Sequence, residues 1–301
     1  MNQNKYSVII PACNAEKTIR RCLDSLLEQG RQDVEILLVS DGSTDGTDAI
    51  ALEYGHKIRF FRQPHSGVSA ARNVGLCHAR GTYVTFVDSD DFVTADYFAV
   101  LDQAPDCDFL AFGAGDCTAT DPLGKLIATR KIMSPCTKRL RRSFLEAHSL
   151  RFPEGLQVGE DFSFCMACAM KADRVEVSAG DIYRADISNP NSLSRRYRPD
   201  LDATMARVFA QIAGLEGAEI YGDLLDFLYV KQAVACIAEE YKQVPPSRQR
   251  VAEICDRFRE PIGSTGGLMH YSLRWLLAHG RGVLWLGAYL GKGWRFKKCR
   301  K

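Results

Sequence analysis

Apolar runs and helical stripes alternate along the first third of the chain. Short runs of aliphatic and β-branched residues predict buried strands, and the segments between them carry apolar residues at helical spacing. We expect strands at 6–10, 34–39, 58–62 and 82–87, and helices at about 15–29, 47–54 and 68–79. Strands and helices joined by short links predict a parallel sheet covered by helices, with its ligand site at the carboxyl ends of the strands.

Two residues near the N-terminus predict where the first strand ends and where the first helix begins. Pro11 follows the first apolar run and is expected to stop that strand, and Asn14 is expected to cap the next helix. The second strand is apolar throughout, which is typical of a parallel strand that is buried on both faces.

The pattern is less regular further along the chain. A strand is expected at 108–113 and a helix is expected to open at Gly159, whereas 114–133 is uncertain and is interpreted as further strands. Apolar and charged residues alternate at helical spacing over 200–260, which predicts several helices that pack together.

Composition places the chain among ordinary globular proteins. Its 301 residues are 46% hydrophobic and 25% charged. The absence of an apolar run of membrane-spanning length predicts no transmembrane helix, and the polar start predicts no signal peptide. The odd count of 11 cysteines favours reduced thiols in a cytoplasmic protein. Cys165 and Cys168 fall within a helical pattern, so we interpret them as small buried residues and not as zinc ligands.

The basic residues gather at the C-terminus. Residues 292–301 hold six bases and no acid, so the other residues carry 33 bases against 37 acids, a net charge of −4. This balance disfavours nucleic acid as a partner. Trp294 and Phe296 stand within the basic tail, which favours peripheral contact with an anionic membrane over the alternative of a disordered tail behind a terminal core helix.

The fourth strand runs directly into three carboxylates. Asp88 and Asp90 are separated by Ser89 and followed by Asp91. Crowded carboxylates raise one another's pKa, and a divalent cation relieves that repulsion. Hard oxygen ligands without nearby cysteine or histidine suit Mg²⁺ or Mn²⁺. The alternative is a solvated acidic turn that caps the next helix.

Four further residues have a structural reading, and Asp41 and Arg72 also have a functional one. Asp41 follows the second strand and can accept an N–H from a nucleobase, or it is a turn residue. Arg72 can meet phosphate, or it forms a surface ion pair. Glu160 and Asp161 open a helix, where the helix dipole alone is a sufficient reason for carboxylates.

Together these stretches resemble the family-2 glycosyltransferases of the GT-A fold. The resemblance covers about residues 6–101 and rests on the segments 7–11, 39–47, 67–75 and 87–91. It implies a mainly parallel, Rossmann-like sheet flanked by helices, in a catalytic domain over 1–198. A helical C-terminal region is then expected over 199–301.

The resemblance also implies roles for individual residues. Asp41 would bind the uracil of a UDP-sugar. The other nucleotide-sugar contacts would come from Pro11, Ala12, Arg72, Asp88, Ser89, Arg195 and Arg196. For Arg195 and Arg196, a solvated basic loop is the alternative. Asp88 and Asp90 would form the metal site for Mg²⁺ or Mn²⁺. Asp161 would be the general base, and Glu160 would support its loop or contact the acceptor.

The expected function is that of an inverting, metal-dependent glycosyltransferase. It would move a sugar from a UDP-sugar to a hydroxyl of a glycan or lipid-linked acceptor, as in the synthesis of a bacterial surface polysaccharide. A catalytically silent nucleotide-sugar-binding module is the alternative. A nicotinamide dehydrogenase is disfavoured because no glycine-rich fingerprint follows the first strand. The sequence does not name the sugar.

Overall fold

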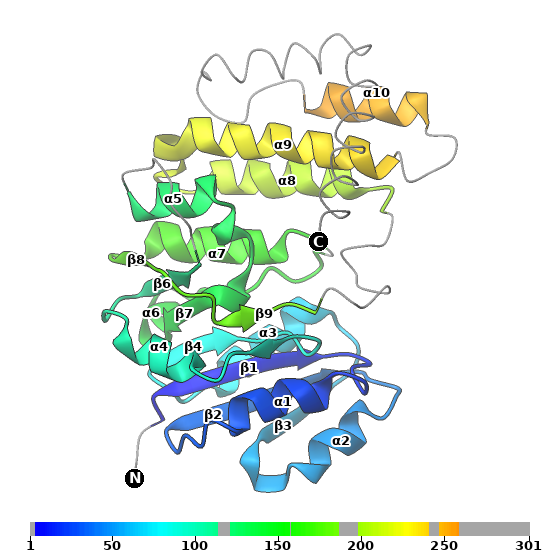
Figure 1. The fold of residues 1–301 in the computed structure, drawn as a ribbon. Coiled ribbons are helices and arrows are strands. Elements are labelled where there is room, and N and C mark those ends of the chain that lie inside the picture. Colours follow the sequence, from blue (N-terminus) through cyan, green and yellow to red (C-terminus); the bar gives the residue numbers. More distant parts are fainter. Residues whose placement is uncertain (1–3, 114–120, 157, 187–197, 241–246, 259–301) are drawn as a thin grey trace, which may run out of the picture. The chain divides into compact units, whose positions relative to one another are not determined.

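A computed structural model describes residues 4–113, 121–156, 158–186, 198–240 and 247–258 of the chain. It divides the chain into two compact units, Met1–Asn189 and Pro190–Lys301 (Figure 1). No helix within the described ranges is both long enough and apolar enough to cross a membrane.

The first unit is built on a seven-stranded sheet in the order β3-β2-β1-β4-β7-β6-β8. Its strands are β1 (Tyr6–Ala12), β2 (Val34–Asp41), β3 (Arg59–Gln63), β4 (Tyr83–Phe86), β6 (Phe109–Phe112), β7 (Lys138–Arg141) and β8 (Val175–Ser178). Strand β7 is antiparallel to both of its neighbours, and the other pairings are parallel. A separate antiparallel pair joins β5 (Phe92–Val93) to β9 (Tyr183–Arg184). The predicted mainly parallel α/β fold is confirmed.

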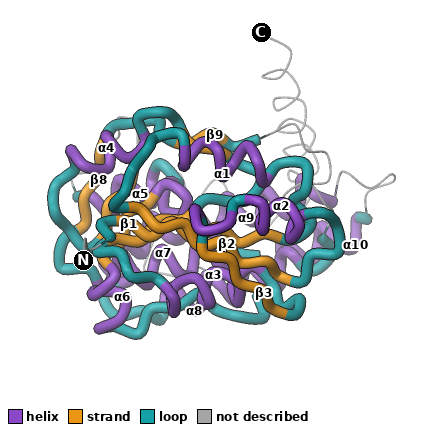
Figure 2. Tube along the Cα trace, turned by 90° about the horizontal axis from the view of Figure 1, so that it is seen from below, coloured by secondary structure: helices purple, strands orange, loops and turns teal. Residues whose placement is uncertain are grey.

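Helices cover both faces of this sheet. They are α1 (Ile19–Leu27), α2 (Thr47–Glu53), α3 (Val68–His78), α4 (Tyr97–Gln103), α5 (Pro122–Ala128), α6 (Arg142–Ala147) and α7 (Glu160–Lys171). In Figure 2, α1 and α2 lie on one side of β1 and β2, and α3 lies on the other. Val8 and Ile10 belong to the apolar core that includes α1 and α4. Their neighbour Ile9 points to the opposite face, as alternation along a strand requires.

Helix α3 packs unusually close to β1. A Cβ atom at Gly75 would overlap Cγ2 of Ile9, so only glycine allows this approach. Gly75 lies one turn after Arg72 on the same helix. The contact therefore fixes the depth at which α3 places the Arg72 side chain.

The start of the chain differs from the expectation in two ways. Strand β1 continues through Pro11 to Ala12. Proline is tolerated there because β4 pairs with β1 only as far as Ile9, and beyond it β1 pairs with β2 alone. Asn14 does not cap α1, which begins at Ile19. Its Oδ1 instead accepts the backbone N–H of Thr44 at 2.8 Å, which ties the end of β1 to the loop after β2.

Residues 122–128 are α-helical and 131–133 form a 3₁₀ turn, so the expectation of further strands was wrong there. Asp121 caps α5 by accepting the backbone N–H of Gly124 at 2.6 Å, and Pro122 occupies the first helical turn. Cys165 and Cys168 are buried free thiols, in agreement with their interpretation as core residues.

The second unit is helical within its described residues, as expected for 200–260. Its helices are α8 (Leu201–Ala213), α9 (Gly222–Glu240) and α10 (Arg248–Arg257). The buried carboxylate of Asp202 accepts from Arg250 and Arg257, each at 2.8 Å, and so joins α8 to α10. The basic tail lies outside the described residues.

Candidate active site

The predicted site residues of the first unit gather where β1, β2 and β4 end. In the parallel register Ala12 is opposite Ser40, and Ile9 is opposite Phe86. The residues that follow these pairs, including Asp41 and Asp88, therefore leave the sheet at the same edge. Pro11 and Ala12 form the last part of β1, with Ala12 buried beside this edge.

Asp41 is buried, and it organises the loop between β3 and α3. Its Oδ1 accepts the backbone N–H of Ser66 at 2.7 Å and the side-chain amide of Gln63 at 2.7 Å. Its Oδ2 accepts the backbone N–H of Gly67 at 2.9 Å. Gly42, next in sequence, has φ +67°, and a Cβ there would overlap the backbone of His65. The carboxylate thus holds the end of β2 against this loop, and its expected contact with a nucleobase stays a prediction.

One buried guanidinium joins two of the predicted carboxylates. Arg72 Nη2 donates to Asp88 Oδ1 at 2.9 Å, and Nη1 donates to Asp161 Oδ1 at 2.5 Å. The Arg72 side chain is only 3% exposed, and its Cζ lies 5.1 Å from the centre of the Phe152 ring. A surface ion pair, the structural alternative for Arg72, is therefore wrong. The pairing unites the end of β4 with the start of α7.

The electrostatics of this group favour an unusual carboxylate. Burial raises the pKa of Asp161 to about 7, although the Arg72 guanidinium opposes the shift; Glu160 and Asp88 raise it further. For Arg72, burial lowers the pKa, but the charges of Asp161 and Asp88 outweigh this effect, so the net shift is upward and the guanidinium stays charged. Asp161 can therefore exchange a proton near neutral pH, as a general base must.

Of the three carboxylates that follow β4, Asp91 is buried, whereas Asp88 and Asp90 are half-buried. Asp91 faces inward: its Oδ2 accepts the Tyr183 hydroxyl at 2.5 Å, and its Oδ1 accepts the backbone N–H of Asp186 at 2.8 Å. Burial raises the pKa of Asp91 to about 6. Burial also raises the pKa of Asp90, and the nearby Asp88 carboxylate adds to that shift.

A divalent cation fits Asp88 and Asp90. Burial and then the neighbouring Asp88 carboxylate raise the pKa of Asp90, a cation here would offset both effects, and the donors are hard oxygens. The turn itself is closed by a hydrogen bond from the Asp91 N–H to the Asp88 carbonyl at 3.0 Å. Asp88 and Asp90 are half-buried in this turn, and their expected role as metal ligands stays a prediction.

Comparisons with known proteins identify the family of this chain. The model of the family "Glycosyl transferase family 2" matches residues 7–103. The uncharacterized glycosyltransferase EpsJ of Bacillus subtilis is 34% identical over 248 residues, which are 70% of this chain and 71% of EpsJ. The chain belongs to glycosyltransferase family 2. The expectation drawn from the sequence is confirmed at this level.

Solved structures share the fold of this family-2 enzyme. TarS of Staphylococcus aureus (residues 1–349, in complex with UDP-GlcNAc) is 24% identical with a TM-score of 0.68, covering 97% of this chain and 92% of that one. The mannosyltransferase PcManGT of Pyrobaculum calidifontis, in complex with GDP-Man and Mn²⁺, is 18% identical with a TM-score of 0.62. That match covers 96% of this chain and 84% of PcManGT.

Two residues that the sequence did not single out support the acidic turn of this glycosyltransferase. The Tyr183 hydroxyl, besides donating to Asp91, accepts the backbone N–H of Asp88 at 3.2 Å. Arg21 on α1 donates to the Asp90 carbonyl at 2.8 Å and to the Asp186 carboxylate at 2.6 Å. In the sequence, Asp91 was the available signal for such partners, because a third carboxylate buried after β4 requires hydrogen-bond donors from other parts of the chain.

The remaining predicted residues have different outcomes. Glu160 opens α7 beside Asp161 and is half-buried, and Gly159 before it has φ +84°. Ser89 lies half-buried within the acidic turn. Arg195 and Arg196 lie outside the described residues, so their expected contact with the diphosphate stays a prediction.

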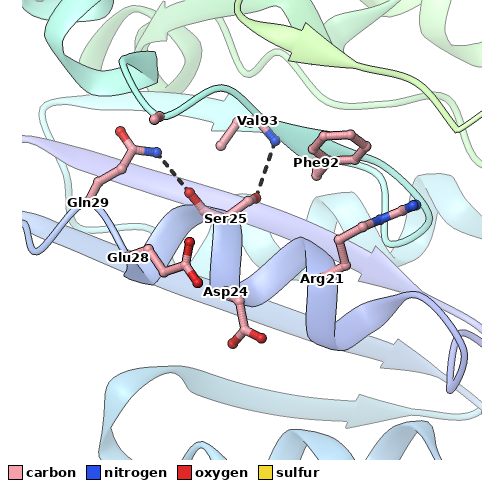
Figure 3. Close-up of a pocket in the computed structure, with 8 residues that line it drawn as sticks. Arg21, Asp24, Ser25, Glu28, Gln29, Phe92 and Val93 are labelled. Carbon is pink, nitrogen blue, oxygen red and sulfur yellow. Dashed lines mark hydrogen bonds between the residues drawn. The ribbon is translucent and has the colours of Figure 1, made fainter.

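A separate pocket of about 620 Å³ lies between α1 and β5 of this enzyme (Figure 3). It is lined by Arg21, Asp24, Ser25, Glu28, Gln29, Phe92, Val93 and Ala95. The Ser25 hydroxyl accepts the backbone N–H of Val93 at 3.2 Å, which ties the two walls together. Arg21 is shared between this pocket and the acidic turn, but the predicted catalytic and binding residues do not line it.

Proposed function

We propose that this family-2 enzyme is a metal-dependent, inverting glycosyltransferase that uses a UDP-sugar. The acceptor is a hydroxyl of a glycan or of a lipid-linked oligosaccharide, in the synthesis of a bacterial surface polysaccharide. The observation that carries the proposal is the Arg72 bridge. It places the carboxylate proposed as base, Asp161, next to the carboxylate proposed as metal ligand, Asp88.

Asp88 and Asp90 would hold Mg²⁺ or Mn²⁺. When bound there, the cation supplies positive charge to the diphosphate as it departs. PcManGT, which has the same fold, is described in complex with Mn²⁺, and this supports a divalent ion at the acidic turn.

Asp161 serves as the general base. It takes the proton of the acceptor hydroxyl while that oxygen bonds to the anomeric carbon and the bond from this carbon to the diphosphate breaks. Its pKa of about 7 makes it a stronger base than an ordinary aspartate and leaves a large ionised fraction at neutral pH. Arg72 holds Asp161 Oδ1 at 2.5 Å, which keeps the carboxylate in one orientation.

The nucleotide base is proposed to lie over the end of β2. Asp41 fixes the loop there through three hydrogen bonds. TarS, whose structure was described with UDP-GlcNAc, supports uridine, whereas PcManGT was described with GDP-Man. Both nucleotides therefore belong in the test.

A catalytically silent binding module is the second candidate. It would need Asp88 and Asp90 but would have no use for a partly buried carboxylate with a raised pKa at position 161. The presence of Asp161 beside Arg72 favours the enzyme.

A calorimetric titration with UDP and with GDP, each with and without Mn²⁺, tests the donor site. We expect UDP to bind only when the metal is present, and Asp90→Ala to lose this metal-dependent binding. Asp173→Asn removes an exposed carboxylate outside the site and serves as the control. Slow hydrolysis of one member of a UDP-sugar panel would then identify the sugar. UDP binding that ignores Mn²⁺ in the unaltered enzyme would refute the metal assignment.

Membrane contact through residues 292–301 remains part of the proposal, together with a location at the inner face of the cell membrane. Co-sedimentation with anionic vesicles, compared with neutral ones and with a chain that ends at residue 291, tests it. Equal sedimentation of both chains with anionic vesicles would refute it.

A further inference from the structure

Three side chains of different chemistry converge beside the end of β2. Cys13 follows β1, Asp41 ends β2, and His65 lies in the loop after β3. Cys13 Sγ lies 3.9 Å from His65 Nδ1, and His65 Nδ1 lies 2.9 Å from Asp41 Oδ2. The thiol, imidazole and carboxylate ligand atoms all lie within 4.8 Å of one another.

The separation between the thiol and the imidazole is close to that in a tetrahedral metal centre. Zn²⁺ bonds of about 2.3 Å to sulfur and about 2.0–2.1 Å to nitrogen place the two ligand atoms roughly 3.6 Å apart. The sulfur and the nitrogen, 3.9 Å apart, therefore need to approach by only a few tenths of an ångström, and the carboxylate ligand atom lies within 4.8 Å of both. The His65 side chain is 70% exposed and Cys13 is exposed, so both can make this adjustment.

The third ligand is already fixed in place. The Asp41 side chain is only 4% exposed, and backbone N–H groups of Ser66 and Gly67 hold its two oxygens. His65 Nδ1 lies within hydrogen-bond distance of Asp41 Oδ2 and of the Asp41 carbonyl oxygen, which is 3.1 Å away, so a cation bound at Nδ1 would replace both contacts. A rigid carboxylate with two adjustable partners suits the capture of an ion from solution.

The donor set differs in kind from that of the acidic turn. Thiolate and imidazole favour borderline metals such as Zn²⁺ and Co²⁺, whereas carboxylates alone suit Mg²⁺ and Mn²⁺. The charges of Asp41 and Asp45 near Cys13 also favour a cation. Burial and these two carboxylates raise the pKa of the Cys13 thiol, so binding releases its proton to solvent.

We propose that Cys13, Asp41 and His65 form a second divalent-cation site, selective for zinc-like ions and separate from Asp88 and Asp90. An ion held there would lie where the nucleotide base is proposed to bind. Zinc would therefore inhibit donor binding, while Mg²⁺ or Mn²⁺ at the acidic turn supports it. Only this inhibitory consequence rests on the proposed function.

Titration of the reduced, metal-free protein with Co²⁺ tests the site directly. A thiolate ligand gives an intense near-ultraviolet absorption band on binding, which carboxylate sites do not give. We expect Cys13→Ser to abolish the band for this site and His65→Ala to weaken Co²⁺ binding at least tenfold. Cys77→Ser is the matched control, because Cys77 is also an exposed thiol but lies on α3 away from this cluster. An unchanged band in Cys13→Ser, or a loss only in Cys77→Ser, would overturn the proposal.

Calorimetry then tests the inhibition. In the presence of Mn²⁺, addition of Zn²⁺ should weaken UDP binding at least tenfold in the unaltered protein and have little effect in His65→Ala. If UDP fails to bind under any condition, the proposed function fails while the Co²⁺ result stands on its own. If UDP binds and Zn²⁺ weakens it equally in both proteins, the inhibitory role of the site is refuted.

Discussion

Replacement of Asp161 by asparagine should make the protein more stable while it abolishes transfer. Asparagine has nearly the shape of a protonated aspartate and keeps an oxygen that can accept from Arg72. It cannot take the proton of the acceptor hydroxyl, so we expect the variant to bind UDP and Mn²⁺ but to show no turnover. The gain in stability follows from the cost of keeping a charge at this position.

The magnitude follows from the pKa of Asp161. Burial raises this pKa from the ordinary 3.8 to about 7 even after the attraction of Arg72 is included. Each unit corresponds to about 1.4 kcal/mol, so the ionised carboxylate destabilises the folded state by about 4 kcal/mol at most. Because the folded pKa lies above the unfolded one, this penalty grows as the pH rises from about 4 to about 7. Linkage therefore predicts that the advantage of asparagine increases by roughly 2–3 kcal/mol between pH 5 and pH 8.

Urea unfolding of both proteins at several pH values measures this difference. A simple helix-dipole argument predicts the opposite sign, because loss of a carboxylate from a helix N-terminus costs about 0.3–1 kcal/mol. Glu160→Gln provides the comparison, since it removes a negative charge from the same turn of α7. An Asp161→Asn protein that is less stable than the parent at pH 8, or whose difference does not change with pH, would refute the reasoning.

Three further predictions concern the same edge of the sheet. Arg72→Lys should lower the transfer rate at least 100-fold in an initial-rate assay, because a single ammonium cannot reproduce the fork that spans Asp88 and Asp161; retention of most of the rate would contradict this. Tyr183→Phe should lower the free energy of unfolding by about 1–3 kcal/mol, because Asp91 loses its hydroxyl donor; urea unfolding measures it, and no loss would contradict it. Asp90→Ala should weaken Mn²⁺-dependent UDP binding at least tenfold in calorimetry, and unchanged affinity would remove Asp90 from the metal site.

The fold was predictable because periodicity reports burial. The continuous apolar run of β2 and the helical stripe of α1 depend only on which faces are covered. The errors arose where local signals compete with tertiary contacts. Asn14 is a good helix cap in isolation, but its side chain is engaged by Thr44. Pro11 breaks a strand with two neighbours and is accepted in one that has a single neighbour at that point.

The candidate site was predictable as a set of residues but not as a network. Asp88 and Asp161 were identified from separate segments, yet nothing local indicates that Arg72 would contact both. Tyr183 lies 95 positions after Asp88, whose backbone it supports. Contacts at such separations depend on how β9 pairs with β5, and a pair of two-residue strands leaves almost no pattern in a sequence.

The Arg72 bridge has a consequence for the order in which ligands arrive. When Asp88 and Asp161 are ionised, their group with Arg72 carries one excess negative charge, and Asp90 adds another. A nucleoside diphosphate is itself an anion and would be repelled by this edge of the sheet. If Asp88 and Asp90 hold the proposed cation, it would arrive before the donor or in complex with it, and free UDP would be a poor inhibitor compared with its metal complex. Kinetically, the metal would then be an obligatory first or simultaneous ligand, and it would determine when the donor can enter the catalytic cycle.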